Sequence, residues 1–280
     1  MPNPLDSLPS LKLTVDVYDL MAKKSLGQNF LLDKNITDKI IRLSLSAQGL
    51  KNFEGQNVFE IGPGPGGLTR SILYQSPQKL TVIEMDDRCI KIMNDIKEKV
   101  GTQLEIINGD ALKTDISKLE SHPRHVISNL PYNISVPLLI SWLKSINSFE
   151  SLTLMFQKEV AERIMANINS KDYGRISILS QLLCKVEKLM DVSPESFTPA
   201  PKIWSSVLLF KPTQIKITEK EIEKIEKITS LAFGQRRKMI RQSLKSIPEL
   251  ESLCEKLSIK PTDRAENIPP EKYLELSRLV

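Results

Sequence analysis

The stretch EIGPGPGGLT, residues 60–69, decides the fold. It follows the apolar run at residues 58–61 and opens a helical pattern, so its glycines stand at a strand-to-helix turn. Glycines at such a turn let the backbone approach a ligand closely, at the carboxyl ends of the strands, where open α/β sheets bind cofactors. Gly62, Gly64 and Gly67 also satisfy the dinucleotide pattern GxGxxG, so a nicotinamide-dependent oxidoreductase is an alternative.

Short apolar runs predict the sheet. They cover residues 58–61, 80–83, 104–107, 126–128, 152–156, 186–190 and 207–210. Helix-length segments separate the early runs, and a helix is predicted over residues 36–45 after a cap at Asp33 or Asn35. This alternation predicts an α/β fold with a mainly parallel sheet. No helical pattern lies between the last two runs, which predicts antiparallel neighbours and, by analogy, the Rossmann-like seven-stranded class I methyltransferase sheet.

The pattern changes to helix after Pro212, where apolar residues recur among alternating Glu and Lys. We therefore place a domain boundary near residue 211, between a cofactor-binding domain at 23–210 and a small C-terminal helical domain at 211–280. Residues 1–22 contain Pro2, Pro4 and Pro9 and are predicted to be a flexible, poorly ordered lead-in.

The composition bounds the function. The 280 residues carry a net charge of +5, which permits a polyanionic partner without requiring one. Cys89, Cys184 and Cys254 lie far apart, so we predict buried reduced thiols and neither a disulfide framework nor a metal site. His122 and His125 flank Pro123 in a predicted solvated loop, which argues against histidine-based chemistry. No apolar window is long enough to span a membrane and no targeting leader is recognisable, so a cytoplasmic protein is expected.

The tetrad Asn129-Leu130-Pro131-Tyr132 follows the fourth apolar run. The Asn129 side chain and the Leu130 backbone offer carbonyl acceptors, Pro131 stiffens the turn, and Tyr132 supplies a flat face on which a ring can stack. These features fit a clamp for a planar amine such as that of adenine. The alternative is a strand followed by an ordinary proline turn.

Two acidic residues follow the second and third runs. Glu84 comes 22 residues after Gly62 and suits acceptance from two ribose hydroxyls, which NAD and S-adenosylmethionine share. Asp110 can accept a hydrogen bond from a cofactor adenine amine, or can instead cap a helix before Ala111 and Leu112. Successive strand ends bearing the glycines, both acids and the tetrad predict a cofactor pocket with an amine acceptor at its rim.

The chain resembles the ribosomal RNA adenine N6-dimethyltransferases, bacterial small-subunit type, from residue 26 to the C-terminus. The resemblance is carried by LGQNFL at 26–31, EIGPGPGGLT at 60–69, IEMDDR at 83–88, GDA at 109–111, NLPYNI at 129–134, MFQKEVA at 155–161, YGR at 173–175, FTPAPK at 197–202 and FGQRRK at 233–238. One local departure is Trp204, which stands where the family commonly has an acidic residue and leaves the packing of that loop open.

The resemblance implies S-adenosylmethionine as the cofactor. The cofactor-binding residues that it implies are Gln28, Asn29, Leu31, Gly62, Gly64, Glu84, Met85, Asp110, Ala111 and Asn129. Among these, Asn29 and Leu31 are expected to hold the methionine end and close the pocket, whereas a capped helix start is the alternative for Gln28 and Asn29.

The resemblance also implies the substrate: two adjacent adenines in a 3′-terminal hairpin loop of 16S ribosomal RNA, each methylated twice within an immature small subunit by a monomeric enzyme. The implied catalytic residues are Asn129, Leu130, Tyr132 and Phe197. The target base must leave its stack, and Tyr132 and Phe197 are expected to stack against it. For Phe197, a loop aromatic that plugs the core is the alternative.

Basic residues cluster near the C-terminus. Arg236, Arg237, Lys238, Arg241 and Lys245 lie within ten residues without an intervening acid. On a helix, residues 237, 241 and 245 would share one face, which favours phosphate contacts by Arg236, Arg237, Lys238 and Arg241, although a solvated face is the alternative. Lys23, Lys24 and Arg70 could extend this footprint.

Three other functions compete with RNA methylation. A non-catalytic nucleic-acid-binding relative, such as the mitochondrial transcription factors of shared ancestry, is disfavoured by the intact pocket motifs. An NAD oxidoreductase is separable by ligand binding. A DNA adenine methyltransferase uses a similar tetrad, but the basic helical module and the surrounding motifs favour RNA.

Overall fold

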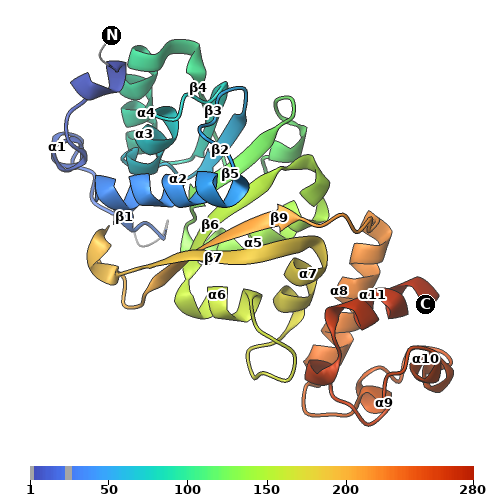
Figure 1. The fold of residues 1–280 in the computed structure, drawn as a ribbon. Coiled ribbons are helices and arrows are strands. Elements are labelled where there is room, and N and C mark those ends of the chain that lie inside the picture. Colours follow the sequence, from blue (N-terminus) through green and yellow to red (C-terminus); the bar gives the residue numbers. More distant parts are fainter. Residues whose placement is uncertain (1–2, 23–26) are drawn as a thin grey trace. The chain divides into compact units, whose positions relative to one another are not determined.

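The structure is a computed structural model and describes residues 3–22 and 27–280 (Figure 1). The chain forms two compact units. The first comprises Met1–Trp142, Asn147–Lys158 and Glu187–Phe210; the second comprises Leu143–Ile146, Glu159–Val186 and Lys211–Val280. The last passage into the second unit occurs at Lys211, next to the predicted boundary, but that unit also takes two earlier segments of the chain. A separate RNA-binding role for residues 211–280 stays a prediction.

A seven-stranded sheet forms the centre of the first unit. In spatial order its strands are β4 (Leu104–Asn108), β3 (Lys79–Glu84), β2 (Asn57–Ile61), β5 (Arg124–Asn129), β6 (Ser151–Gln157), β9 (Ser205–Pro212) and β7 (Cys184–Val192). The pairs that join β4 through β6 are parallel, whereas β9 is antiparallel to β6. All seven predicted strands are confirmed, and the order with one reversed strand is that of the class I methyltransferase fold.

Helices connect these strands and build the second unit. The first group is α1 (Leu11–Val17), α2 (Lys34–Gln48), α3 (Gly67–Leu73), α4 (Asp87–Val100) and α5 (Tyr132–Lys144). The second group is α6 (Lys158–Ile164), α7 (Arg175–Leu183), α8 (Glu219–Gly234), α9 (Ile240–Ser243), α10 (Leu250–Lys256) and α11 (Pro270–Leu279). None of the helices among the described residues is long and apolar enough to cross a membrane.

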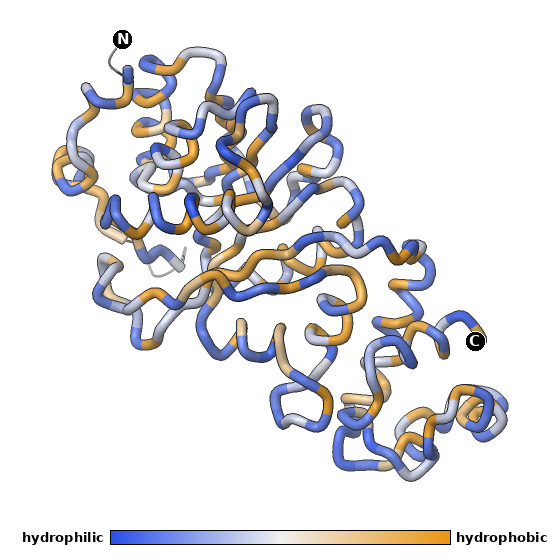
Figure 2. Tube along the Cα trace, in the orientation of Figure 1, coloured by the Kyte–Doolittle hydropathy of each residue, from blue (hydrophilic) through white to orange (hydrophobic). Residues whose placement is uncertain are grey.

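Helix α2 shows how local sequence sets an element. The Asp33 carboxylate accepts a hydrogen bond from the Asn35 N–H at 2.8 Å, so Asp33 is the N-cap, as one of the two predicted alternatives had it. Gly49 ends the helix at a φ of 70°, a conformation that glycine adopts without strain. Ile40, Ile41 and Leu45 are buried, and polar residues alternate with them around α2 in Figure 2.

The sheet centre is apolar. Every residue of β2 is buried, as are all residues of β6 except the last, and hydrophobic residues follow the central strands in Figure 2. His125 lies inside this layer in β5, so its predicted place in a solvated loop is wrong. Its Nδ1 and Nε2 atoms each lie 2.9 Å from a partner, Ser151 Oγ and Gln56 Oε1. Burial lowers the pKa of His125 to about 4. The three cysteines are buried thiols that take part in no disulfide bond among the described residues.

Residues 3–22 correct the prediction of a flexible lead-in. They form a short 3-10 helix, Pro4–Ser7, and helix α1. Leu5 and Leu20 are 5% and 2% exposed and join the hydrophobic cluster of the first unit. The prolines misled the prediction because Pro4 stands at the first position of a helix, where its missing N–H costs nothing.

A second sheet of two short strands was not predicted. Strand β1 (Phe30–Leu31) pairs antiparallel with β8 (Phe197–Thr198), with Phe30 opposite Thr198 and Leu31 opposite Phe197. Two-residue strands are too short to show an alternating pattern, so local sequence carries no signal for them.

Three aromatic rings pack together in the second unit. The Phe233 ring lies 6.1 Å from that of Tyr173 and 6.3 Å from that of Tyr273. Both tyrosine hydroxyls donate to backbone carbonyls, Tyr173 to Ile268 at 2.9 Å and Tyr273 to Ala265 at 2.8 Å. Two of the stretches that carry the family resemblance, YGR and FGQRRK, therefore supply rings to this group.

The basic segment, residues 235–245, is not the predicted continuous helix. Helix α8 ends at Gly234, and α9 holds only Ile240–Ser243. The Ile240 N–H donates to the Asp263 carbonyl at 2.7 Å and the Arg241 N–H to the Pro261 carbonyl at 3.2 Å, so a distant loop takes the donors that a continuing helix would use. The prediction that residues 237, 241 and 245 share one helical face is wrong.

Candidate active site

A pocket of about 290 Å³ opens at the carboxyl ends of four neighbouring strands. It is lined by the glycine loop after β2, Glu84 after β3, Asp110 after β4 and Asn129 after β5, together with residues 27–31, which we call the lip. The predicted site residues that line it are Gln28, Asn29, Leu31, Gly62, Gly64, Glu84, Met85, Asp110, Ala111, Asn129, Leu130 and Tyr132. The structure thus brings together residues from five separate stretches of sequence, while their individual roles stay predictions.

Glu84 is fixed by backbone donors. Its Oε1 accepts hydrogen bonds from the N–H groups of Met85 and Asp86 at 2.8 and 2.9 Å, and its Oε2 from that of Gly64 at 3.4 Å. Burial raises the pKa of Glu84, and the backbone donors oppose that rise. A carboxylate has about four lone-pair sites, so Glu84 keeps acceptor capacity for a ligand hydroxyl.

Glu60 also lines the pocket, although sequence reasoning gave it no role. It is 2% exposed, and the Thr69 hydroxyl donates to its Oε2 at 2.7 Å. The pKa of Glu60 is raised to about 8: burial raises it most, the Thr69 hydrogen bond lowers it, and the nearby Glu84 charge adds a smaller rise. The available signal was an acidic residue in an otherwise apolar run, VFEI, at a position inside a fully buried strand.

Asp110 lines the pocket and caps a turn rather than the helix of the alternative prediction, and its contact with a cofactor adenine stays a prediction. Its Oδ1 accepts from the Leu112 N–H at 2.9 Å, so it caps a turn, although no helix follows. The residue is half-buried and lines the pocket, where its second carboxylate oxygen stays available as an acceptor.

The lip lies against the glycine loop. Gly64 has a φ of 55°, and a Cβ on it would stand 3.0 Å from the Phe30 ring. A Cβ on Gly67 would stand 2.7 Å from the Leu31 carbonyl oxygen, closer than a methyl group can approach. Side chains at these two positions would push the lip away, so the glycines allow the lip to form one wall of the pocket.

Asn129 ends β5, a strand with a partner on each side, and its backbone pairs with Met155 of β6. Its Nδ2 donates to the Asn29 carbonyl at 3.3 Å. Because a carbonyl can only accept, this contact assigns the amide orientation and leaves Oδ1 as the acceptor at the pocket. The contact with Asn29 of the lip thus orients the Asn129 amide so that its Oδ1 is the acceptor at the pocket.

Tyr132 and Phe197, the two predicted stacking residues, differ in exposure. Tyr132 is half-buried and lines the pocket, with its hydroxyl 2.7 Å from Ser205 Oγ. Phe197 is 3% exposed, belongs to the hydrophobic cluster and does not line the pocket. In this structure Phe197 has the buried position of the alternative prediction, opposite Leu31 in the β1–β8 sheet, while its stacking against the target base stays a prediction.

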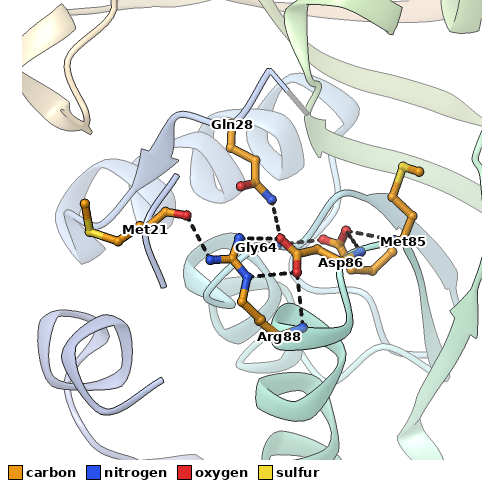
Figure 3. Close-up of polar contacts among 7 residues, drawn as sticks. Met21, Gln28, Gly64, Met85, Asp86 and Arg88 are labelled. Atoms are coloured by element: carbon orange, nitrogen blue, oxygen red, sulfur yellow. Dashed lines mark hydrogen bonds and ion pairs between the residues drawn. The ribbon is translucent and has the colours of Figure 1, made fainter. Parts of the chain in front are cut away.

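Gln28 has a protein partner that the sequence did not suggest. Its Nε2 donates to Asp86 Oδ2 at 3.1 Å (Figure 3). The alternative of a capped helix start at Gln28 and Asn29 is wrong, since the next helix begins at Lys34.

Comparison with known proteins identifies the family. The model of the family described as Ribosomal RNA adenine dimethylase matches residues 20–280. This chain belongs to that family. A curated relative, Ribosomal RNA small subunit methyltransferase A of Rhodospirillum rubrum, is 46% identical over 99% of this chain and 94% of its own. The protein of the same name in Paramagnetospirillum magneticum is 45% identical over 97% and 94%. The family resemblance predicted from the motifs is confirmed.

A solved structure adds a fold match. The crystal structure of a dimethyladenosine transferase from Plasmodium falciparum superposes with a TM-score of 0.70 at 28% identity, covering 87% of this chain and 94% of that one. The chain is accordingly a methyltransferase of the adenine dimethylase family, and the pocket of the first unit lies where this fold binds its ligands.

The basic residues of this adenine dimethylase fall into two groups. Arg236 is engaged within the second unit, because its Nε lies 2.6 Å from Glu266 Oε2 and its Nη2 donates to the Ser170 carbonyl at 3.0 Å. In contrast, no ion pair to a described residue is found for the exposed side chains of Arg237, Lys238, Arg241 and Lys245. Arg237, Lys238 and Arg241 thus remain candidates for RNA contacts, while Arg236 has a structural task.

The other basic residues of the predicted footprint, which are Arg70, Lys23 and Lys24, offer less support for RNA contacts. Arg70 donates to the Pro9 carbonyl at 2.6 Å and to Thr14 Oγ1 at 3.3 Å, so it fastens the N-terminal residues. Lys23 and Lys24 lie outside the described residues, as does Leu26 of the first motif.

Proposed function

We propose that this protein transfers methyl groups from S-adenosylmethionine to N6 of two adjacent adenosines in the 3′-terminal hairpin loop of 16S ribosomal RNA, giving N6,N6-dimethyladenosine. Family membership and the name shared by the curated relatives support the reaction class and the small-subunit substrate. The observation that carries the proposal is the Asn129 amide, oriented by Asn29 with its acceptor end at the pocket. We also propose that the enzyme acts in the cytoplasm as a monomer on the immature subunit.

The residues present fit S-adenosylmethionine. Glu84 would accept from the ribose hydroxyls, Asp110 from the adenine amine, and the lip with Gly62 would hold the methionine end. The close approach of the lip to Gly64 and Gly67 supports this fit, because a Cβ at either glycine would alter the wall of the pocket. When bound, S-adenosylmethionine supplies an electrophilic methyl group on its sulfonium centre.

The chain activates the amine without a strong base. The lone pair of an adenine amine is delocalised into the ring, so the nitrogen is a poor nucleophile until its N–H groups are held out of the ring plane. Asn129 Oδ1 and the Leu130 carbonyl would accept from these two N–H groups and favour a pyramidal nitrogen. After transfer the nitrogen is cationic and acidic, so its proton leaves to water or to a carbonyl. Positioning then supplies most of the acceleration.

Tyr132 would carry the target base. Its half-buried ring lines the pocket beside Asn129, and the contact between its hydroxyl and Ser205 fixes the ring. A base extruded from its stack regains part of its stacking energy on such a face. With Phe197 buried in this arrangement, Tyr132 alone of the two predicted aromatic residues offers this surface.

The exposed basic residues would bind phosphates. Of the four predicted contacts, Arg237, Lys238 and Arg241 are exposed, as is the neighbouring Lys245, whereas Arg236 is paired with Glu266. Exposed charges can pair with phosphate at little desolvation cost, and they add affinity that falls as salt rises.

The decisive experiment uses undermethylated small subunits and S-adenosylmethionine labelled in its methyl group. We expect label in N6,N6-dimethyladenosine and a primer-extension stop at two adjacent positions only when enzyme is present. The absence of incorporation would overturn the proposal. Thermal stabilisation by NAD but not by S-adenosylhomocysteine would instead support the oxidoreductase alternative.

A further inference from the structure

Asp86 is the hub of a polar cluster beside the pocket. Its side chain is 2% exposed, and its carboxylate accepts from Arg88 Nε at 3.0 Å, from Arg88 Nη2 at 2.6 Å and from Gln28 Nε2 at 3.1 Å (Figure 3). It also accepts from the Arg88 N–H at 3.2 Å and so caps α4. The hydrogen bonds from Arg88 hold the pKa of Asp86 well below its usual range. Neither Asp86 nor Arg88 lines the pocket.

This cluster contacts the chain at Met21 and at the lip. Arg88 Nη1 donates to the Met21 carbonyl at 3.0 Å, and Gln28 is the second residue of the lip itself. Figure 3 shows both contacts meeting at the turn between β3 and α4. The same turn carries Glu84, whose carboxylate is held by the N–H of Asp86. Asp86 therefore holds both the lip, through the Gln28 side chain, and the predicted ribose acceptor Glu84, through its own N–H.

The lip in turn sets the Asn129 amide. Residue 29 follows Gln28 directly, and its carbonyl is the acceptor that engages Asn129 Nδ2. Without that carbonyl the amide could rotate by half a turn and present its donor end to the pocket. A donor at that point would repel the amine N–H that the reaction needs to hold.

We propose that Asp86 is a positioning residue for methyl transfer. Through Gln28 it holds the lip so that the Asn29 carbonyl keeps the acceptor end of Asn129 toward the pocket. Asp86 itself does not line the pocket, and it acts on two features of the site: the lip wall of the pocket and the orientation of the proposed amine acceptor. This inference rests on the proposed function, because it concerns the same pocket.

A double-mutant cycle isolates the contact. Asp86→Asn keeps a residue that caps helices well but replaces one acceptor oxygen by a donor, while Gln28→Met keeps length and removes the donor. We expect each variant to weaken S-adenosylhomocysteine binding, measured by calorimetry, and to lower kcat at saturating cofactor, each by roughly tenfold, since small misplacements cost large factors in rate. The loss in the double variant should be clearly smaller than the sum of the two single losses, because each single variant already removes the Gln28–Asp86 contact.

Rescue and control variants separate positioning from general destabilisation. Unlike Gln28→Met, Gln28→Lys keeps a donor toward Asp86. It should therefore retain part of the kcat that Gln28→Met loses, which a purely structural defect would not allow. Arg70→Gln is the matched control, because Arg70 fastens Pro9 and Thr14 upstream of the lip. It should lower the melting temperature without changing S-adenosylhomocysteine affinity.

The outcomes distinguish the two proposals. If the parent protein does not bind S-adenosylhomocysteine, the proposed function fails. If the parent binds it but the Gln28 and Asp86 variants keep parental affinity and kcat, the positioning role fails while the function stands. Additive losses in the double variant would also overturn it, because the two residues would then act separately.

Discussion

The pocket of the first unit and the basic segment of the second differ in how their polar side chains are satisfied. At the pocket, Glu84 and Asn129 form hydrogen bonds with the backbone that fix their orientations. In the basic segment, Arg237, Lys238 and Arg241 carry exposed charges on a turn and on a helix of four residues. Chemistry requires groups fixed before the substrate arrives, whereas phosphate binding requires charge that is free to adapt.

The largest expected effect on activity comes from a substitution in the pocket, where the polar side chains are fixed. Asn129→Ala removes the amine acceptor and the contact with Asn29, so kcat should fall by at least about a hundredfold. S-adenosylhomocysteine affinity, measured by calorimetry, should largely survive. Asn108→Ala serves as the control and should have a small effect, because Asn108 also ends a strand of the sheet but is exposed and does not line the pocket. A weaker cofactor affinity with an unchanged rate would reassign Asn129.

Substitutions in the basic segment should change RNA binding and its dependence on salt. Replacing Arg237, Lys238, Arg241 and Lys245 by Gln should weaken RNA binding and reduce the slope of log affinity against log salt by roughly one for each phosphate contact that is removed. Filter binding over a salt series measures both quantities. Arg236→Gln is the contrasting variant: without its ion pair to Glu266, thermal stability should fall while the salt slope stays nearly unchanged. An unchanged slope in the fourfold variant would contradict RNA docking by this segment.

The pocket also predicts a pH dependence. The pKa of Glu60 is raised in the folded state to about 8, so the folded protein keeps a proton that the unfolded chain releases near its ordinary value. Its contribution to stability is complete below about pH 4.5 and is lost as pH rises through about 8. Glu60→Gln keeps an acceptor for Thr69 and removes the titration. Urea unfolding at about pH 5, 7 and 9 should show a profile that is flatter for the variant by roughly a few kcal/mol.

His125 gives the smallest effect, with the opposite sign. Its folded pKa of about 4 lies below the ordinary value of 6.5, so the unfolded chain binds a proton first and stability falls as pH drops between these values. The loss should reach about 2 kcal/mol near pH 5. His125→Gln should be less stable at about pH 8, where it lacks one of the two hydrogen bonds, but should lose less on acidification. A parallel decline in both proteins would show that His125 does not titrate in this range.

Local sequence specified the sheet because its strands are long and apolar enough to show a pattern. The strand ends then placed Glu84, Asp110 and Asn129 correctly around one pocket, since parallel strands present their carboxyl ends at the same edge. Glu60 was overlooked because a single acid inside an apolar run resembles a break in the pattern rather than a pocket residue.

The features that the sequence did not predict share a physical cause, which is that each depends on a partner distant in sequence. The burial of Phe197 depends on pairing with Leu31, and the Gln28 side chain depends on Asp86. The basic segment leaves the helix because a loop near Asp263 takes its donors. None of these partners can be read from a window of local sequence.

The backbone of Asn129 and the Asn29 carbonyl that orients its side chain differ in local stability. The strand of Asn129 lies between two others in the sheet, so its backbone can be released only by an opening that approaches global unfolding. The carbonyl that orients it lies beside a strand of two residues, which can detach at far lower cost. Amide hydrogen exchange should therefore be slow at Ile127 and much faster at Leu31, so the orientation of the Asn129 amide can be lost reversibly while the fold stays intact.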